Sequence, residues 1–147
     1  MGYFIVFQNR SYDEEKNGGY LWAPRKDNLG REHFFWSNMT KINEGDIIFS
    51  VCKRNVVSIN TAKGRSIEAD RPTKVSDQAL QQEDGWLVKV RYNVLGNPID
   101  IDGNTNEILK LCPSNYSPFT KEGKGNQGYL YEIGNELGEY LLKLANA

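Results

Sequence analysis

The stretch FFWSNMTKINEGDIIFSVCKRNVVSINTAKG, residues 34–64, decides the fold of this chain. Apolar and more polar side chains alternate through Ile47–Cys52, and a β-branched pattern resumes at Val56, as in two consecutive strands. The segment Lys53–Asn55 between them is polar and tolerates a turn, so we predict two strands joined by a basic loop. Trp36 lies ahead of both strands, and we therefore select it as a candidate functional residue.

Two further strands are predicted from the same patterns. Tyr3–Phe7 is a near-continuous apolar run, as expected of a strand that is covered on both faces. Gly85–Tyr92 alternates between apolar and charged side chains, and we place Trp86 on its inward side. The dipeptide Asn97-Pro98 is expected to break this strand, because proline cannot donate a ladder hydrogen bond.

The remaining segments are predicted as helices and loops. Apolar residues at helical spacing indicate a C-terminal helix whose stripe is Leu130, Ile133, Leu137, Leu141 and Leu144, with Gly134 and Gly138 permitting close packing on the sheet. Asn104 is a candidate cap for a short helix through Leu111, and Ser37 or Asn38 for a helical turn. We expect turns, loops or irregular structure in Ser11–Gly19, in Arg65–Gln82 apart from a short helix from Ser76, and in Ser114–Gly128.

Length and composition indicate one soluble domain that covers residues 1–147. Hydrophobic residues make up 39% of the chain, and no apolar run approaches the roughly 20 residues of a membrane helix. The start of the sequence does not read as a signal peptide, so we expect a cytoplasmic protein without membrane association. The net charge of −1 attracts no polyanion globally, so nucleic-acid binding needs a local patch.

No group of residues has the spacing typical of catalysis or of a metal site. Cys52 and Cys112 are isolated and His33 is the only histidine, which argues against a zinc site and a histidine-based triad. Gly123–Gly128 matches the dinucleotide-binding pattern G-x-G-x-x-G, but it follows a loop instead of a strand. We therefore predict no metal, no cofactor and no catalytic residue.

Polar and basic side chains supply candidates for binding. The first strand ends in Gln8-Asn9-Arg10-Ser11, which forms either an ordinary polar loop or the mouth of a pocket. Short basic patches occur at Arg25, Lys26, Arg31, Lys53, Arg54, Lys63, Arg65, Lys121 and Lys124. These residues either only keep the surface soluble or face phosphates together.

The order of these features resembles the PUA-like superfamily, and within it the EVE and YTH domains, which read modified bases. The resemblance rests on FIVFQNRS (residues 4–11), Trp36-Ser37, EGDIIFSV (44–51), VVSINTAKG (56–64), GWLVKVRY (85–92) and NQGY (126–129), which opens the last helix. It implies an α+β fold, a partly closed mixed β-barrel with short peripheral helices and a C-terminal helix. LWAP at residues 21–24 and NQGY look similar to EVE modules attached to modification-dependent restriction nucleases.

The resemblance implies a base-flipping reader, in which the target nucleotide leaves the stack and enters an aromatic cage. Trp36 would stack on the base, Trp22 would form a second wall, and a further aromatic would come from Tyr116, Phe119 or Tyr129. The implied polar pocket residues are Gln8, Asn9, Arg10, Ser37, Asn38, Asn126 and Gln127. The implied phosphate contacts are Arg25, Lys26, Lys53, Arg54, Lys121 and Lys124.

The expected function is therefore binding of DNA that carries a methylated or hydroxymethylated base, as the specificity module of a modification-dependent restriction system. We expect a monomeric domain without enzymatic activity, with any nuclease in another segment or partner. Three alternatives stay open: a modified-RNA reader of the YTH type, a small nucleotide-processing enzyme, and an adaptor whose exposed aromatic residues dock a peptide.

Overall fold

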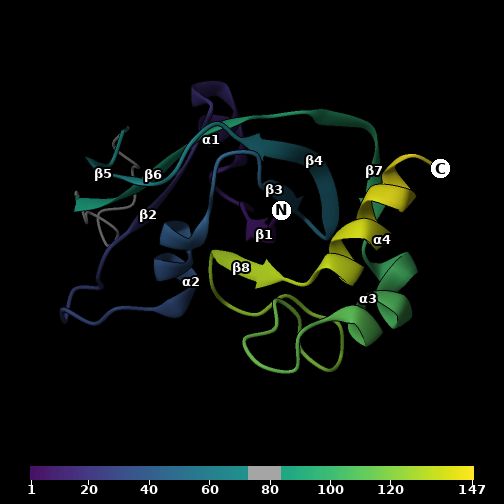
Figure 1. The fold of residues 1–147 in the computed structure, drawn as a ribbon. Coiled ribbons are helices and arrows are strands. Elements are labelled where there is room, and N and C mark those ends of the chain that lie inside the picture. The colour runs from purple at the N-terminus through teal and green to yellow at the C-terminus, as the bar shows by residue number, and fades with distance from the viewer. Residues whose placement is uncertain (73–83) are drawn as a thin grey trace.

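The computed structural model describes residues 1–72 and 84–147, in which the strands form one mixed sheet curled into a half-barrel (Figure 1). The strands are β1 (Tyr3–Phe7), β2 (Tyr20–Pro24), β3 (Ile47–Cys52), β4 (Asn55–Ala62), β5 (Ile67–Asp70), β6 (Asp84–Arg91), β7 (Val94–Asp100) and β8 (Leu130–Ile133). The helices are α1 (Tyr12–Gly18), α2 (Phe34–Ser37), η1 (Asn38–Lys41), η3 (Asp102–Asn104), α3 (Thr105–Leu111) and α4 (Asn135–Ala145). Neighbouring strands follow the order β2-β6-β4-β3-β1-β8, while β5 pairs with β6 and β7 pairs with β4.

The two strands predicted within residues 34–64 are confirmed, and they lie at the centre of the sheet. β3 pairs antiparallel with β4, and β1 lies parallel on its other side, with Ile5 opposite Phe49. Lys53 and Arg54 form the turn between β3 and β4, with φ angles of 50° and 66°. Positive φ at both central residues is typical of the two-residue hairpin turn whose twist matches the right-handed twist of the flanking strands. The predicted basic turn is thus two residues long, because Asn55 already belongs to β4.

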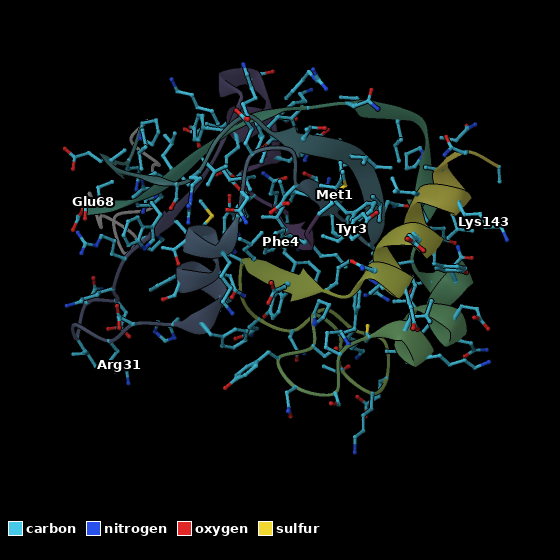
Figure 2. All side chains as sticks on the ribbon, viewed as in Figure 1. Met1, Tyr3, Phe4, Arg31, Glu68 and Lys143 are labelled. Carbon is cyan, nitrogen blue, oxygen red and sulfur yellow. The ribbon has the colours of Figure 1, made fainter. Side chains whose placement is uncertain are left out.

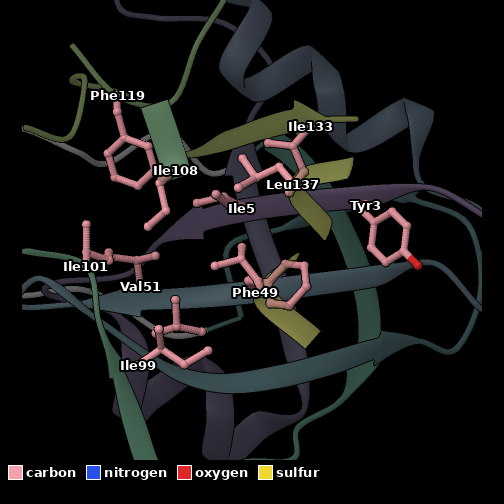
Figure 3. Close-up of a cluster of buried hydrophobic side chains, with 12 residues drawn as sticks. Tyr3, Ile5, Phe49, Val51, Ile99, Ile101, Ile108, Phe119, Ile133 and Leu137 are labelled. Atoms are coloured by element: carbon pink, nitrogen blue, oxygen red, sulfur yellow. The ribbon is translucent and has the colours of Figure 1, made fainter. Parts of the chain in front are cut away.

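The sheet separates two apolar cores, because successive side chains of a strand point to opposite faces. Ile5 and Phe49 belong to the core beneath α3 and α4, which Figure 3 shows. Phe4 packs in the second core, together with Met39 of η1. A Cβ at Gly138 would lie 2.3 Å from Cγ of Tyr3, so this glycine lets α4 pack closely on β1, as predicted. A Cβ at Gly134 would meet nothing within 4 Å, so that glycine has no such role.

Helix α1 forms where the sequence predicted a polar loop. It ends at Gly19, whose φ of 71° is the left-handed conformation common after a helix. Glu15 is the buried residue of this helix, with 3% of its surface exposed. A helix whose buried position carries a carboxyl group lacks the apolar period by which helices are predicted.

Three strands also differ from the prediction. Leu130–Ile133 is strand β8, paired antiparallel with β1, and the C-terminal helix begins only at Asn135. β7 continues through Asn97-Pro98, which is tolerated because this strand pairs with β4 alone among the described strands. Ile67–Asp70 adds strand β5 beside β6 within the segment predicted to be irregular.

The remaining helix predictions are partly confirmed. The turn predicted after Trp36 consists of α2 and η1, but α2 begins at Phe34 and neither Ser37 nor Asn38 caps it with its side chain. Asn104 precedes α3 as predicted, although its side chain makes no capping bond. The helix predicted from Ser76 lies outside the described residues. None of the helices in residues 1–72 and 84–147 has the length and apolar character needed to cross a membrane.

Candidate functional site

A cavity of about 470 Å³ lies where the end of β1, helix α1, strand β2 and helix α2 meet. Its lining consists of Phe7, Asn9, Arg10, Ser11, Glu14, Glu15, Tyr20, Trp22, Ala23, Pro24, Trp36, Arg71, Pro72, Gly128 and Tyr129. The volume falls within the range of roughly 300–1,000 Å³ that is usual for small-molecule sites. Aromatic walls and a few polar groups therefore enclose a space that can take a planar ligand.

Trp36 reaches the cavity from helix α2 and is held by the segment before that helix. The His33 ring lies edge-on to the indole, with 4.7 Å between centroids, and its Nε2 is 2.9 Å from Oδ2 of Asp27. Asp27 also accepts hydrogen bonds from the backbone N–H groups of Leu29 and Arg31. The Arg31 backbone N–H first, and then His33, hold the pKa of the Asp27 carboxyl well below its usual range. This arrangement fixes the edge of Trp36 while the ring stays half-buried.

Trp22 also lines the cavity, from β2. Its indole N–H donates to the carbonyl of Ala69 at 3.0 Å. The guanidinium carbon of Arg71 lies 4.3 Å from the ring centroid, so a cation covers an indole face. A Cβ at Gly85 would approach the indole to 2.3 Å, which shows how tightly β6 passes this ring. Trp22 is consequently 6% exposed, and Arg71 forms part of the cavity surface above it.

The carboxyl group of Glu15 forms the polar base of the cavity. Its Oε1 accepts hydrogen bonds from Gln8 Nε2 (2.8 Å), Ser11 Oγ (2.9 Å) and the Tyr129 hydroxyl (2.6 Å). Its Oε2 accepts from the Trp22 backbone N–H at 2.7 Å and from the same tyrosine. Burial raises the pKa of Glu15 to about 7, although these donors favour the ionised form and act against the shift.

A chain of polar side chains continues from Glu15 into the sheet. Gln8 donates from Nε2 to the Tyr92 hydroxyl at 2.9 Å, and its Oε1 accepts from Ser50 Oγ at 2.5 Å. Asn60 Nδ2 donates to the same Ser50 oxygen at 2.8 Å. Burial raises the pKa of Tyr92 and of Tyr129 well above the ordinary value, so both hydroxyl groups stay protonated and donate. Gln8 is only 1% exposed and therefore supports the cavity from beneath.

Solved structures with this arrangement of strands and helices exist, although the sequence itself matches little. No protein-family model matches the chain, and no curated protein matches it. Human THYN1 in complex with DNA containing 5-methylcytosine superposes with a TM-score of 0.63, over 100% of this chain and 99% of that one, at 10% identity. The chain has the PUA-like fold of the EVE and YTH domains.

Two YTH domains support the same conclusion. The Pho92 YTH domain in complex with m6A gives a TM-score of 0.59 over 99% of this chain and 86% of that one, at 16% identity. The MRB1 YTH domain of Zygosaccharomyces rouxii, in complex with N6-methyladenosine RNA, gives 0.58 over 98% and 86%, at 12% identity. The expected α+β half-barrel with a C-terminal helix is thereby confirmed.

The cavity brings together five of the residues proposed for the pocket from sequence. They are Asn9, Arg10, Trp22, Trp36 and Tyr129. They come from four separate segments: the end of β1, β2, α2 and the residues before β8. The polar end of β1, with Asn9 and Arg10, and Trp36 of α2 therefore line the same cavity although they are far apart in sequence.

The other proposed pocket residues lie outside the cavity lining. Gln8 lies beneath it, and Asn38 is buried with its Nδ2 donating to the Leu130 carbonyl at 3.0 Å. Phe119 is part of the apolar core, in edge contact with Phe7. Asn126 Nδ2 donates to the Ser117 carbonyl at 2.7 Å and so ties the loop. Ser37, Gln127 and Tyr116 are also outside the lining, and Tyr116 packs on Phe34.

The residues proposed for phosphate contact are distributed over several surfaces. Lys53 lies beside the cavity, because its backbone N–H donates to Oδ1 of Asn9 at 2.7 Å. Arg54 instead pairs with Asp102 at 2.6 Å, and Arg25 pairs with Glu68 and Asp84. Lys26, Lys121 and Lys124 are exposed.

Sequence reasoning missed three charged residues of the lining: Glu14, Glu15 and Arg71. Glu14 and Glu15 lie in a helix that was predicted as a loop, and Arg71 follows a strand in a segment predicted as irregular. In residues 1–72 and 84–147, no group of three or more His, Cys, Asp or Glu residues is placed to hold a metal ion. The chemistry that this lining offers is stacking on indole and phenol rings, combined with hydrogen bonds to and from charged groups.

Proposed function

We propose that this domain binds a modified nucleobase that is flipped out of a DNA strand into the cavity. The observation that carries this proposal is the half-buried Trp36 ring in the lining of a cavity that Asn9 and Arg10 also line. An extruded base is recognised in this way, by stacking on aromatic side chains and by hydrogen bonds to its edge. THYN1 in complex with DNA containing 5-methylcytosine, which has a similar fold, supports the choice of ligand class.

The proposed roles follow from the positions of the side chains. Trp36 stacks on the base, which is worth about 1–3 kcal/mol for a single base. Asn9 and Arg10 hydrogen-bond to the base edge or to the neighbouring phosphate. Tyr129 is anchored by Glu15 and closes the base of the site. Trp22 supplies a second wall through its edge, because Arg71 covers its face.

The wider context is also a proposal. The EVE-like segments LWAP and NQGY favour a specificity module of a modification-dependent restriction system, with the nuclease in another segment or partner. In that setting the domain acts as a monomer in the cytoplasm and does not itself cleave DNA. Phosphate contacts are proposed for Lys53, Lys26, Arg25, Arg54, Lys121 and Lys124. Lys53 is the strongest of these candidates, because it is tied to Asn9 of the cavity.

The test is a binding panel at fixed, moderate salt. Identical duplexes carry cytosine, 5-methylcytosine, 5-hydroxymethylcytosine, its glucosylated form, or N6-methyladenine, and are titrated with the wild type, Trp36→Ala and Trp36→Phe. We expect one modified duplex to bind at least about tenfold more tightly, with the preference lost in the alanine variant and largely kept in the phenylalanine variant. Equal binding of all duplexes by the wild type and Trp36→Ala contradicts the proposal, because phosphate contacts alone would explain it.

A modified-RNA reader is the second candidate, and the two YTH domains in complex with methylated adenine support it. Single-stranded RNA costs less energy to extrude the base, because no base pair has to open, and it offers its 2′-hydroxyl as an additional contact. Titration of RNA and DNA oligonucleotides that carry the same modification distinguishes an RNA reader from a DNA reader, because each should bind its own nucleic acid more tightly. The third candidate function is a nucleotide-processing enzyme. Mass spectrometry of the oligonucleotides after incubation with the protein tests it, because an enzyme would change their mass.

A further inference from the structure

Two exposed aromatic rings pack on each other outside the cavity. Phe34 of α2 is 41% exposed and Tyr116 is 70% exposed. Their ring centroids are 4.6 Å apart with a tilt of 49°. The pair forms a small exposed apolar surface, in which Phe34 is backed by Phe35 and the more exposed Tyr116 offers the larger area for stacking on a flat partner.

The loop between α3 and β8 holds Tyr116 in an unfavourable backbone conformation. Its φ of 56° is left-handed, which costs a non-glycine residue of order 1 kcal/mol or more. The residues that follow anchor the loop: Asn126 Nδ2 donates to the Ser117 carbonyl at 2.7 Å, and Phe119 is buried in the core. The anchored loop thus holds Tyr116 in a strained backbone conformation, and in that conformation its phenol ring is exposed.

This aromatic pair is continuous with the wall of the cavity. The Trp36 and Phe35 ring centroids are 5.5 Å apart, and those of Phe35 and Phe34 are 5.4 Å apart. A Cβ at Gly128, which lines the cavity, would lie 2.6 Å from the Phe35 ring. Rings therefore run in a series of contacts from the cavity wall to Tyr116, and Figure 1 shows the loop after α3 passing below β8, to the right of α2.

We propose that Phe34 and Tyr116 form a second stacking site, for a base next to the flipped one on the same strand. The inference rests on the proposed function, because it needs a flipped base in the cavity to bring the strand there. A flipped nucleotide leaves its neighbours at the mouth of the pocket, where they have lost a stacking partner. Lys121 and Lys124 are exposed on the same loop, beside one acidic residue, Glu122, and suit the backbone of that strand.

The experiment compares a free nucleoside with a strand. The probes are N6-methyladenosine, 5-methyl-2′-deoxycytidine, and single-stranded pentanucleotides with either base at the centre, intact or with an abasic site at one flanking position. The variants are Tyr116→Asn, which removes the ring but suits a positive φ, and Tyr116→Phe, which keeps the ring. Trp36→Ala serves as the cavity control.

We expect Tyr116→Asn to weaken binding of the intact pentanucleotide about tenfold and to leave nucleoside binding unchanged. One of the abasic pentanucleotides should bind the wild type and Tyr116→Asn equally, and Tyr116→Phe should match the wild type. Equal binding of the intact strand by the wild type and Tyr116→Asn overturns the second site, while loss of nucleoside binding in Trp36→Ala would still support the cavity. Failure of the wild type to bind any modified nucleoside or strand overturns both proposals.

Discussion

Glu15 places an ionisable group in a position where water cannot stabilise its charge. Two donors that approach the carboxyl group are the Tyr129 hydroxyl and the Trp22 backbone N–H, yet burial still raises its pKa to about 7. An acid whose folded pKa exceeds its unfolded pKa of about 4.5 binds a proton more strongly in the folded state. Its contribution to stability is therefore complete below about pH 4.5 and declines as the pH rises to about 7.

This linkage predicts the pH dependence of unfolding. The free energy of unfolding should fall by about 3 kcal/mol between pH 4.5 and pH 8 through Glu15 alone. In Glu15→Gln that contribution should be absent, although the variant is less stable overall, because the new amide adds a donor among existing donors. Urea denaturation of both proteins at pH 5, 6, 7 and 8 measures the two slopes. Identical slopes would contradict a raised pKa.

Asp27 predicts a different effect, on binding instead of stability. Asp27→Asn should loosen the His33 ring and so the edge contact of Trp36, weakening the binding of modified duplex by a few-fold. Arg31→Ala is the matched control, because Arg31 (labelled in Figure 2) pairs with Asp27, whereas the ring in edge contact with Trp36 is that of His33. Arg31→Ala should keep its free energy of unfolding within about 0.5 kcal/mol of the wild type. Asp27→Asn should lose some stability, because the ionised carboxylate holds the loop through several hydrogen bonds, so urea denaturation first establishes that this variant is folded under the binding conditions. Equal affinities of the two variants would show that His33 does not position the indole.

At the scale of secondary structure, α4 and β1 approach each other at a glycine. Gly138→Ala gains about 1 kcal/mol of helix propensity, but the added Cβ would lie 2.3 Å from Cγ of Tyr3. We expect a net loss of about 1–3 kcal/mol in the free energy of unfolding, since the helix must shift to relieve the overlap. Gly134→Ser, at the position before α4 with open space around it, should cost nothing or stabilise the protein. Urea titration of both variants tests the difference, and equal stability would contradict the close packing.

The elements that sequence reasoning predicted well are those whose own residues carry the signal. The alternation of Ile47–Cys52 and the apolar run Tyr3–Phe7 are local patterns, and both strands have the predicted bounds. α1 could not be predicted in this way, because its buried residue is a carboxyl group whose partners come from β1, β2 and the segment before β8. β8 was hidden because Leu130 and Ile133 continue the apolar spacing of α4 across Gly134.

The same distinction applies to the site. Trp36 and the polar end of β1 could be selected because each is out of place in its local pattern. Arg71 could not, since its role depends on the position of Trp22 in another strand. Phe119 and Asn126 were grouped with the pocket because the resemblance implies an aromatic ring from a late loop and polar groups from NQGY, whereas the structure uses them to anchor the loop before β8.

For the whole molecule, a net charge of −1 means that any attraction to nucleic acid is local. Lys53→Ala, beside the cavity, should weaken the binding of modified and unmodified duplexes equally and reduce the slope of log K against log salt by about 1. Lys143→Ala is the control, because Figure 2 places Lys143 on helix α4, away from the cavity elements. Titrations at several salt concentrations measure both slopes. An unchanged slope for Lys53→Ala would show that this lysine does not contact a phosphate.

The pairing of β1 with both β3 and β8 has a consequence for synthesis of the protein on the ribosome. Residues 3–7 are synthesised well before residues 130–133, so their β8 edge has no partner until the latter have been translated. Contacts between segments so distant in sequence form late, because a long loop must close before they are gained. The nascent chain therefore carries an apolar strand with an open edge until residues 130–133 follow, and the cavity is completed only when Gly128 and Tyr129 have been synthesised. Chaperone dependence during synthesis, and a binding activity that appears only once residues 128–133 have been made, are the expected outcomes.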